Sequence, residues 1–291
     1  MVGDAPTPNF LYIGTSKAGS TWLFNALAHH PDVFLASSKG LYFFDQHFSN
    51  GTDWYLGQFA GAGGKPAIGE ISHSYLSSPE APGRIADLNR DMRLLVCLRE
   101  PVDRAFSDYL DLVKNGQYNG PFKDALDRYP RLLDRGMYAT HLQRYFDRFP
   151  SQQMHIRLFD DLRTDAQAYA DDVFQFLGVR QFTLPPAHLK TRMPAGKPRS
   201  DAVAGLAKST SRLVKRAGLT GVRARAKRSV LLRQALYRPY AEDRPAVDPV
   251  LAVELRQVFS EEVEQLDSML DAPVSAQWGY REASPDSAGR P

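Results

Sequence analysis

The chain has 291 residues, of which 36 are basic and 33 acidic, so its formal net charge is only +3. This length suits one large domain or two small ones, and the nearly balanced charge gives no strong case for nucleic-acid binding. The one cysteine, Cys97, excludes a disulfide framework within the chain, which fits a reducing compartment. The first residues do not resemble a signal peptide, and no run approaches the roughly 18 apolar residues of a membrane span. We expect a soluble, cytoplasmic protein.

The first predicted elements form a typical site for an anion. Phe10–Ile13 is a short apolar run of β-preferring residues, and Gly14–Gly19 is a loop that contains Lys17. Ser20 and Thr21 then open a segment with apolar residues at helical spacing. Such a helix N-terminus directs backbone N–H groups and the positive end of the helix dipole at a phosphate, and the lysine adds a full charge. An ordinary strand-to-helix turn with a solvated lysine is the alternative.

The position of the lysine differs from that in ATP- and GTP-binding loops. Those loops have the form G-x-x-x-x-G-K-[ST]. Gly14 and Gly19 have this separation, but Ser20 stands where the lysine would be and Lys17 lies inside the loop. The sequence therefore predicts a phosphate site without assuring the magnesium arrangement of an ATPase.

Further strands and helices alternate along the chain. Strands are predicted at Asp32–Ala36, Ala67–Ile71, Arg93–Leu98 and His155–Phe159, and helices at Asp53–Phe59, Ala81–Asn89, Pro101–Val113, Pro121–Tyr129, Tyr138–Phe149 and Asp161–Leu177. The alternation predicts an α/β fold, a P-loop-type parallel sheet with helices on both faces. In such sheets the ligand lies at the carboxyl ends of the strands. Lys17, His73 and Arg99 each follow a predicted strand, so three separate stretches converge on one crevice.

One aromatic segment has two interpretations. Ser37–Phe48 contains Lys39, Asp45 and His47 among its aromatic residues. Core packing beneath a domain edge and a functional role are equally compatible with this composition.

The chain changes in character after Pro185. Lys190–Arg199 is a basic loop, 203–238 carries many lysines and arginines and hardly any acid, and Asp248–Leu270 has the pattern of an amphipathic helix. The basic segment is either a solvated helical face or a peripheral contact with an anionic surface or acceptor. The seven histidines are not spaced like a zinc site, so no metal is expected.

Two stretches together resemble one enzyme family. TSKAGSTWL (15–23) is similar to the 5′-phosphosulfate loop of sulfotransferases that use 3′-phosphoadenosine 5′-phosphosulfate (PAPS). RLLVCLREPVDRAFSDYL (93–110) is similar to their 3′-phosphate motif, a strand ending in arginine with a serine eight residues later. The resemblance continues through KGLYFFD, WYLGQF, GEISHSYL, APGRI, RGMY and FQFLGV to Trp278, and is greatest to bacterial and heparan-type carbohydrate sulfotransferases.

The resemblance implies roles for the residues of the donor site. Lys17 would bridge the 5′-phosphate and the departing oxygen, and Ala18, Gly19, Ser20 and Thr21 would supply donors to that phosphate. Sulfuryl transfer puts charge on the bridging oxygen, so a fixed cation belongs there, and the acceptor proton needs a base.

The same resemblance implies contacts to the rest of the donor. Trp22 would lie against the adenine, and Arg99 and Ser107 would hold the 3′-phosphate. A lid would close over that phosphate from the basic loop, through Arg192, Lys197 and Arg199.

The chain departs from the family pattern in two places. Family members often have an acidic residue after the lysine of a K-[DE]-x-x-F-F segment, and several use it as the base; here that position is Gly40. Phe159-Asp160-Asp161-Leu162 stands where many relatives have tyrosine-glutamate-aspartate-leucine, so a tyrosine hydroxyl near the adenine is missing.

The candidates for the base are therefore His73, Glu70 and Asp45. His73 comes first, because it follows the Ala67–Ile71 strand by two residues and its imidazole suits general-base catalysis. By resemblance, Ile71-Ser72-His73 falls where cytosolic sulfotransferases that act on hydroxyls have a lysine, a serine or threonine, and the catalytic histidine. A structural histidine is the alternative, in which case Glu70 would orient the loop and Asp45 would be the reserve base.

These observations predict a PAPS-dependent sulfotransferase with a single domain at 8–291, made of a nucleotide-binding core (8–185) and a basic and helical C-terminal region (186–291) that packs on it. It would transfer a sulfuryl group by in-line displacement to a hydroxyl, rather than an amine, of a carbohydrate, glycolipid or small-molecule natural product, without a metal. The product would be adenosine 3′,5′-bisphosphate (PAP). A P-loop kinase for a small molecule and a non-catalytic relative that binds PAPS or PAP are the alternatives.

Overall fold

A computed structural model of the protein describes residues 6–189, 196–198, 237–239 and 245–281. Arg192, Arg199 and all of the basic segment before residue 237 lie outside these ranges, so the lid and the contact with an anionic surface stay predictions. Within the predicted basic loop, strand β6 (Gly196–Pro198) pairs antiparallel with β7 (Tyr237–Pro239).

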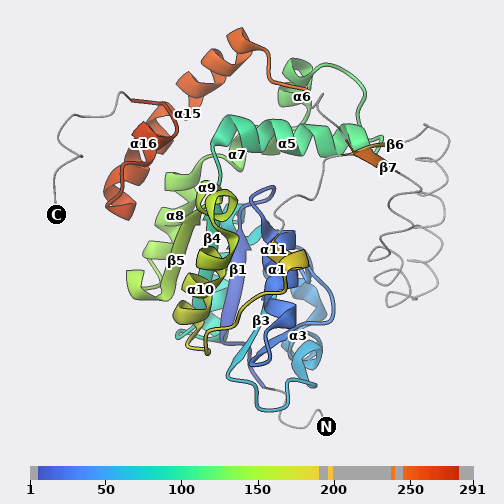
Figure 1. The fold of residues 1–291 in the computed structure, drawn as a ribbon, viewed down its shortest axis with the longest axis vertical. Coiled ribbons are helices and arrows are strands. Elements are labelled where there is room, and N and C mark those ends of the chain that lie inside the picture. The colour runs from blue at the N-terminus through green and yellow to red at the C-terminus, as the bar shows by residue number, and fades with distance from the viewer. Residues whose placement is uncertain (1–5, 190–195, 199–236, 240–244, 282–291) are drawn as a thin grey trace.

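Five parallel strands form the centre of the fold (Figure 1). They are β1 (Phe10–Gly14), β2 (Val33–Leu35), β3 (Ala67–Ile71), β4 (Arg93–Leu98) and β5 (Met154–Leu158), in the order β2-β3-β1-β4-β5. All five residues of β1 are buried, as expected for a central parallel strand that is covered on both faces. The predicted parallel sheet is therefore confirmed.

Helices cover both faces of the sheet. They are α1 (Ser20–His29), α2 (Phe43–Gln46), α3 (Thr52–Leu56), α4 (Ala81–Leu88), α5 (Pro101–Lys114), α6 (Phe122–Arg128), α7 (Arg131–Asp134), α8 (Tyr138–Phe146), α9 (Phe159–Thr164), α10 (Ala166–Leu177), α11 (Pro186–Leu189), α15 (Pro249–Leu270) and α16 (Val274–Gln277). Phe10 and Tyr12 point into one core with α1 and α10, while Leu11 and Ile13 point into a second core with α4, α8 and α15. The alternation along β1 follows from the two-residue period of a strand.

Helix α5 begins where β4 ends. Pro101 occupies its first turn, and the Glu100 carboxylate accepts hydrogen bonds from the N–H groups of Val102 and Asp103 at 3.2 and 2.6 Å. Figure 1 shows α5 lying across the end of the sheet at which β4 ends. The predicted C-terminal helix is present as α15 and packs on α5 and α8.

One predicted helix is wrong. The sequence pattern suggested a single helix at Asp161–Leu177, whereas the structure has α9 and α10 with Asp165 between them in an extended conformation. The Asp165 carboxylate accepts from the N–H groups of Gln167 and Ala168, at 3.0 and 2.9 Å, and so caps α10. Phe159, which was predicted to end β5, begins α9 instead. An N-cap that breaks the helix for one residue leaves the apolar pattern almost unchanged.

We expect the contact between β1 and β3 to require glycine at position 69. A Cβ atom on Gly69 would lie 2.2 Å from the carbonyl oxygen of Phe10, its partner in the sheet. Gly69→Ala should therefore lower the free energy of unfolding by about 1–3 kcal/mol, as overpacking of a core does. Urea unfolding monitored by circular dichroism measures this change.

Gly83 on α4 provides the matched control. A Cβ atom there would meet nothing within 4 Å, so Gly83→Ala should leave stability unchanged or raise it by about 0.4–1 kcal/mol. Equal stabilities of the two variants would contradict the steric explanation.

Candidate active site

The loop after β1 turns the chain into α1. Lys17 and Gly19 have left-handed backbone conformations, with φ of 67° and 82°. A Cβ atom on Gly19 would lie 2.6 Å from Leu162 Cδ2 of α9, so glycine suits both the conformation and the space. Within the described residues no side chain caps α1 at Gly19. The first turn of α1 therefore keeps N–H groups for an anion.

Helix α5 presents one face to this loop. Asp103, Ser107 and Asp111 are spaced four residues apart, so they lie on the same side of α5. Asp111 Oδ1 lies 3.2 Å from Lys17 Nζ, and Asp103 Oδ2 lies 3.4 Å from Arg99 Nη2. Ser107 therefore lies on this face of α5, between the two aspartates that pair with Lys17 and Arg99.

Arg99 is fixed against the loop at the end of β4. Its side chain is largely buried, and Nη1 donates to the Lys17 carbonyl oxygen at 3.2 Å. The guanidinium carbon lies 5.1 Å from the centre of the Phe159 ring, a distance typical of cation–π contact. The Arg99 carbonyl oxygen accepts from the Tyr138 hydroxyl at 2.7 Å. The predicted meeting of Lys17 and Arg99 is therefore present.

Lys39 reaches the same loop from the aromatic segment. Its Nζ donates to Ser20 Oγ at 3.0 Å and to Thr21 Oγ1 at 2.6 Å. Burial, and after it the positive charge of Lys17, lowers the pKa of Lys39 to about 8. The sequence analysis did not include Lys39 in the donor site, although the lysine of the K-[DE]-x-x-F-F pattern was a signal. The aromatic segment thus serves the core through Phe43 and Phe44 and the site through Lys39.

Trp22 is enclosed by protein. Its indole Nε1 donates to the His188 carbonyl oxygen of α11 at 2.7 Å, and its ring meets Tyr169 edge to face with 5.7 Å between centroids. The side chain belongs to the core on the α1 and α10 face of the sheet. Its expected contact with adenine stays a prediction.

His73 lies at the carboxyl end of β3, as the sequence predicted. Its Nε2 is hydrogen-bonded to the Tyr42 hydroxyl at 2.8 Å, whereas its buried Nδ1 has no partner among the described residues. Burial, followed by the charges of Arg135 and Lys39, lowers the pKa of His73 to about 4. The imidazole is therefore neutral near pH 7, and several cations face it.

Glu70 is enclosed beneath the site. Its carboxylate accepts from Ser72 Oγ and the Tyr75 hydroxyl at 2.7 Å each, from the Tyr55 hydroxyl at 3.2 Å and from the Leu41 N–H at 3.3 Å. Burial raises the pKa of Glu70, and these hydrogen bonds oppose the rise. Four donors around one carboxylate favour a positioning role.

Asp45 has one free carboxylate oxygen. Its Oδ2 accepts from Ser74 Oγ at 2.5 Å and from Gln46 Nε2 at 3.3 Å. Its Oδ1 is buried and, within the described ranges, has no hydrogen-bond partner. Asp45 therefore stays available as the reserve base.

The Tyr42 ring fills the space beside Gly40. Gly40 has φ of 78°, and a Cβ atom there would lie 2.6 to 2.8 Å from three atoms at the far end of Tyr42, including the hydroxyl oxygen. An acidic residue at position 40 would displace that hydroxyl. Glycine at this position is therefore matched to the present place of Tyr42.

An ion network that the sequence analysis missed lies under the loop. The fully buried Arg104 donates to Ser16 Oγ at 3.4 Å and pairs with Asp108 Oδ2 at 3.5 Å. Arg135 Nη1 lies 3.3 Å from the same Asp108 oxygen. The network fastens the loop to α5 and holds the charge of Arg135 near His73. The four-residue spacing of Arg104 and Asp108 was its one signal in the sequence.

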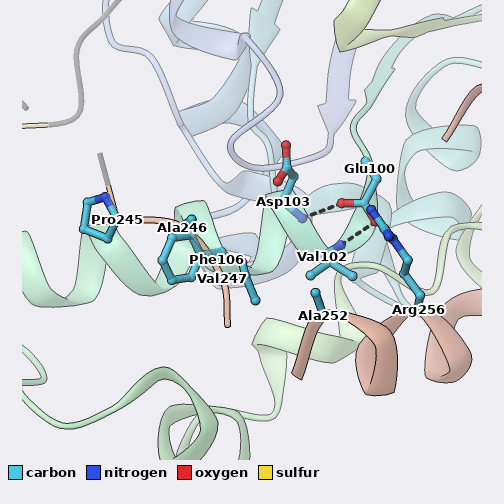
Figure 2. A pocket seen from close by; sticks show the side chains of 9 residues that line it. All are labelled: Glu100, Val102, Asp103, Phe106, Pro245, Ala246, Val247, Ala252 and Arg256. Atoms are coloured by element: carbon cyan, nitrogen blue, oxygen red, sulfur yellow. Dashed lines mark hydrogen bonds between the residues drawn. The ribbon is translucent and has the colours of Figure 1, made fainter. Parts of the chain in front are cut away.

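A cavity of about 380 Å³ lies between the start of α5 and the segment that leads into α15. Figure 2 shows Glu100 bonded to the first turn of α5 beside it. Asp103 lines this cavity and also pairs with Arg99, so the cavity borders the Arg99 side of the site. In the described part of the chain, no three His, Cys, Asp or Glu side chains gather as a metal site would require. None of the described helices is long and apolar enough to cross a membrane.

Comparison with known proteins points to one family. Residues 7–194 match the family model described as sulfotransferase domain. Human heparan sulfate glucosamine 3-O-sulfotransferase 3B1 is 30% identical over 188 residues, which are 62% of this chain and 48% of that protein. Mouse bifunctional heparan sulfate N-deacetylase/N-sulfotransferase 4 is 30% identical over 196 residues, 59% of this chain and 22% of the relative. The chain thus spans about half or less of the length of these relatives.

A solved structure shares the fold. The sulfotransferase from Alicyclobacillus acidocaldarius superposes with a TM-score of 0.70 at 24% identity, covering 94% of this chain and 99% of that one. Its sheet and helices agree with the architecture in Figure 1. Because the family model also matches well over half of the sequence, the chain belongs to the sulfotransferase family.

Proposed function

We propose that the protein transfers a sulfuryl group from PAPS to a hydroxyl of a carbohydrate, glycolipid or small-molecule natural product by in-line displacement. The observation that carries this proposal is the place of Arg99, held between the phosphate loop and the face of α5 that bears Ser107. An arginine there suits a second phosphate, such as the 3′-phosphate that distinguishes PAPS from ATP. The names of the relatives, which specify heparan sulfate, support a carbohydrate acceptor.

The residues present fit this donor. The open first turn of α1 and the row of cations beside it would receive an anionic nucleotide. When bound, PAPS supplies the sulfuryl group and a departing oxygen on which negative charge develops. Lys17 would stabilise that charge, and Arg99 with Ser107 would hold the 3′-phosphate. Lys197 lies in β6, and its role in a lid, with Arg192 and Arg199, is part of the proposal.

We assign the base to His73. With its Nε2–H donated to the Tyr42 oxygen, Nδ1 is the ring atom left to take the proton of an acceptor hydroxyl, and the side chains that now bury it would have to move as the acceptor binds. The low pKa keeps this atom unprotonated at pH 7. The cations Arg135, Lys39 and Lys17 contribute to that low value, so a bound anion would raise the basicity of His73 by offsetting them.

Cys97, buried and free, supports a reducing, cytoplasmic location.

The first test compares two nucleotides. If Arg99 and Ser107 hold the 3′-phosphate, PAP should bind much more tightly than 5′-AMP, by about 1.5–3 kcal/mol for each charge-assisted hydrogen bond. Arg99→Met should remove most of this difference, while Arg128→Met, at an exposed position, should keep it. Isothermal calorimetry with and without magnesium measures both. Equal affinities for the two nucleotides would refute the donor assignment, and a need for ATP and magnesium would favour a kinase.

The second test concerns Lys17. Its main partner charge would appear only in the transition state, so Lys17→Ala should lower kcat much more than it weakens PAP binding. Turnover of labelled PAPS against a panel of acceptors, alongside PAP calorimetry, separates the two effects. A variant that loses only PAP affinity would reassign Lys17 to simple phosphate binding.

The third test distinguishes the candidate bases. At saturating donor, His73→Ala should reduce kcat on the order of 10²–10⁴-fold, and Asp45→Asn should have a much smaller effect. If Asp45→Asn abolishes turnover while His73→Ala retains it, the base is Asp45. A native protein that binds PAP but turns over no acceptor would instead support the non-catalytic alternative.

A further inference from the structure

We propose that Lys39 is a second lysine of the donor site, which binds the 5′-phosphate end of the nucleotide and takes up a proton as it does so. The inference rests on the proposed function, because it requires the nucleotide to bind at the loop after β1. It adds a residue that lies in neither the 5′-phosphosulfate loop nor the 3′-phosphate motif. It also makes donor binding depend on pH.

The geometry places the Lys39 ammonium at the N-terminus of α1. Its ammonium donates to the hydroxyls of Ser20 and Thr21, the first two residues of that helix. An ammonium has three N–H groups, and these two hydroxyls engage two of them. Beyond these two contacts, the ammonium has a third N–H group that a phosphate at this helix end could accept.

Among the described residues, the charge of Lys39 has no counter-ion. Three neighbouring cations have carboxylate partners: Lys17 with Asp111, Arg99 with Asp103, and Arg135 with Asp108. Across the described ranges, Lys39 forms no ion pair with an aspartate or glutamate. A partly buried ammonium without a counter-ion loses its proton more readily. We infer that the anion that balances Lys39 is supplied by a bound ligand.

The groups that face Lys39 make its charge sensitive to that anion. Lys17 faces it from the loop and, after burial, lowers its pKa to about 8. From the segment after β3, His73 lies within electrostatic range of Lys39, and His73 in turn senses the cation Arg135 and the anion Asp108. A phosphate dianion in this space favours the ammonium form of Lys39. Binding near pH 8 should thus be accompanied by proton uptake.

The experiment measures proton uptake when PAP binds. Calorimetry at pH 8 in buffers of different ionisation enthalpy should give roughly half a proton per PAP for the native protein. The phosphates of PAP contribute little there, because their second pKa lies near 6. Lys39→Arg should bind PAP with no proton uptake, since its guanidinium stays charged. Lys39→Met should bind roughly 10- to 100-fold more weakly, also without uptake.

Two controls restrict the effect to the 5′-phosphate. Adenosine 3′-monophosphate lacks this phosphate, so Lys39→Met should bind it as the native protein does. Lys123→Met removes the same charge from an exposed site, where Lys123 pairs with Glu254, and should behave as native. Lys39→Arg keeps the test valid if Lys39→Met does not fold.

The outcomes separate the inference from the proposed function. Native binding of PAP without proton uptake, or uptake that persists in Lys39→Arg, would overturn the role of Lys39 alone. A native protein that does not bind PAP at all would overturn the proposed function and this inference with it.

Discussion

Four hydrogen bonds converge on the buried carboxylate of Glu70, and the arrangement of the site around His73 depends on them. The donors are the Leu41 N–H and the Tyr55 hydroxyl on one side, and the hydroxyls of Ser72 and Tyr75, which follow β3, on the other. Glu70 thereby connects the two segments. A carboxylate buried in this way is tolerated only when its lone pairs are satisfied. The bonds bring the segment with Lys39 and Tyr42 against the strand end with His73. Two stretches about thirty residues apart in the sequence thereby become one surface.

The cations near this surface fall into two groups, which differ in how deeply their ion pairs are buried. Arg104 and Arg135 share the Asp108 carboxylate, at 3.5 and 3.3 Å, and the side chains of Arg104 and Asp108 are almost entirely buried. Lys17 and Arg99 pair with carboxylates that are about half exposed, and such pairs are weak enough to exchange for a ligand. The ion pairs that anchor the loop are thus largely buried, whereas the pairs of the cations that would meet a nucleotide have a half-exposed partner.

The sequence predicted the sheet and the meeting of Lys17 and Arg99, because these depend on regular patterns. Central strands are apolar throughout, and residues after parallel strands share one edge. It did not predict the contacts of Lys39 or the pairing of Tyr42 with His73, because irregular backbone sets them. Gly40 and Tyr42 adopt left-handed conformations, with φ of 78° and 51°, and no periodicity encodes such a turn. The one-residue break at Asp165 was missed for the same reason, since the apolar pattern continues across it.

The close approach of Gly40 and Tyr42 bears on how such a site can change over evolution. A glutamate at position 40 would need the space that the Tyr42 ring and hydroxyl occupy, and it would break the Tyr42–His73 hydrogen bond. A carboxylate there and the present Tyr42–His73 hydrogen bond therefore compete for the same space. A side chain at position 40 therefore requires either that the Tyr42 ring turns away or that position 42 carries a smaller residue. Replacements at these two positions are thus coupled, and a change at one alters which residues the other tolerates.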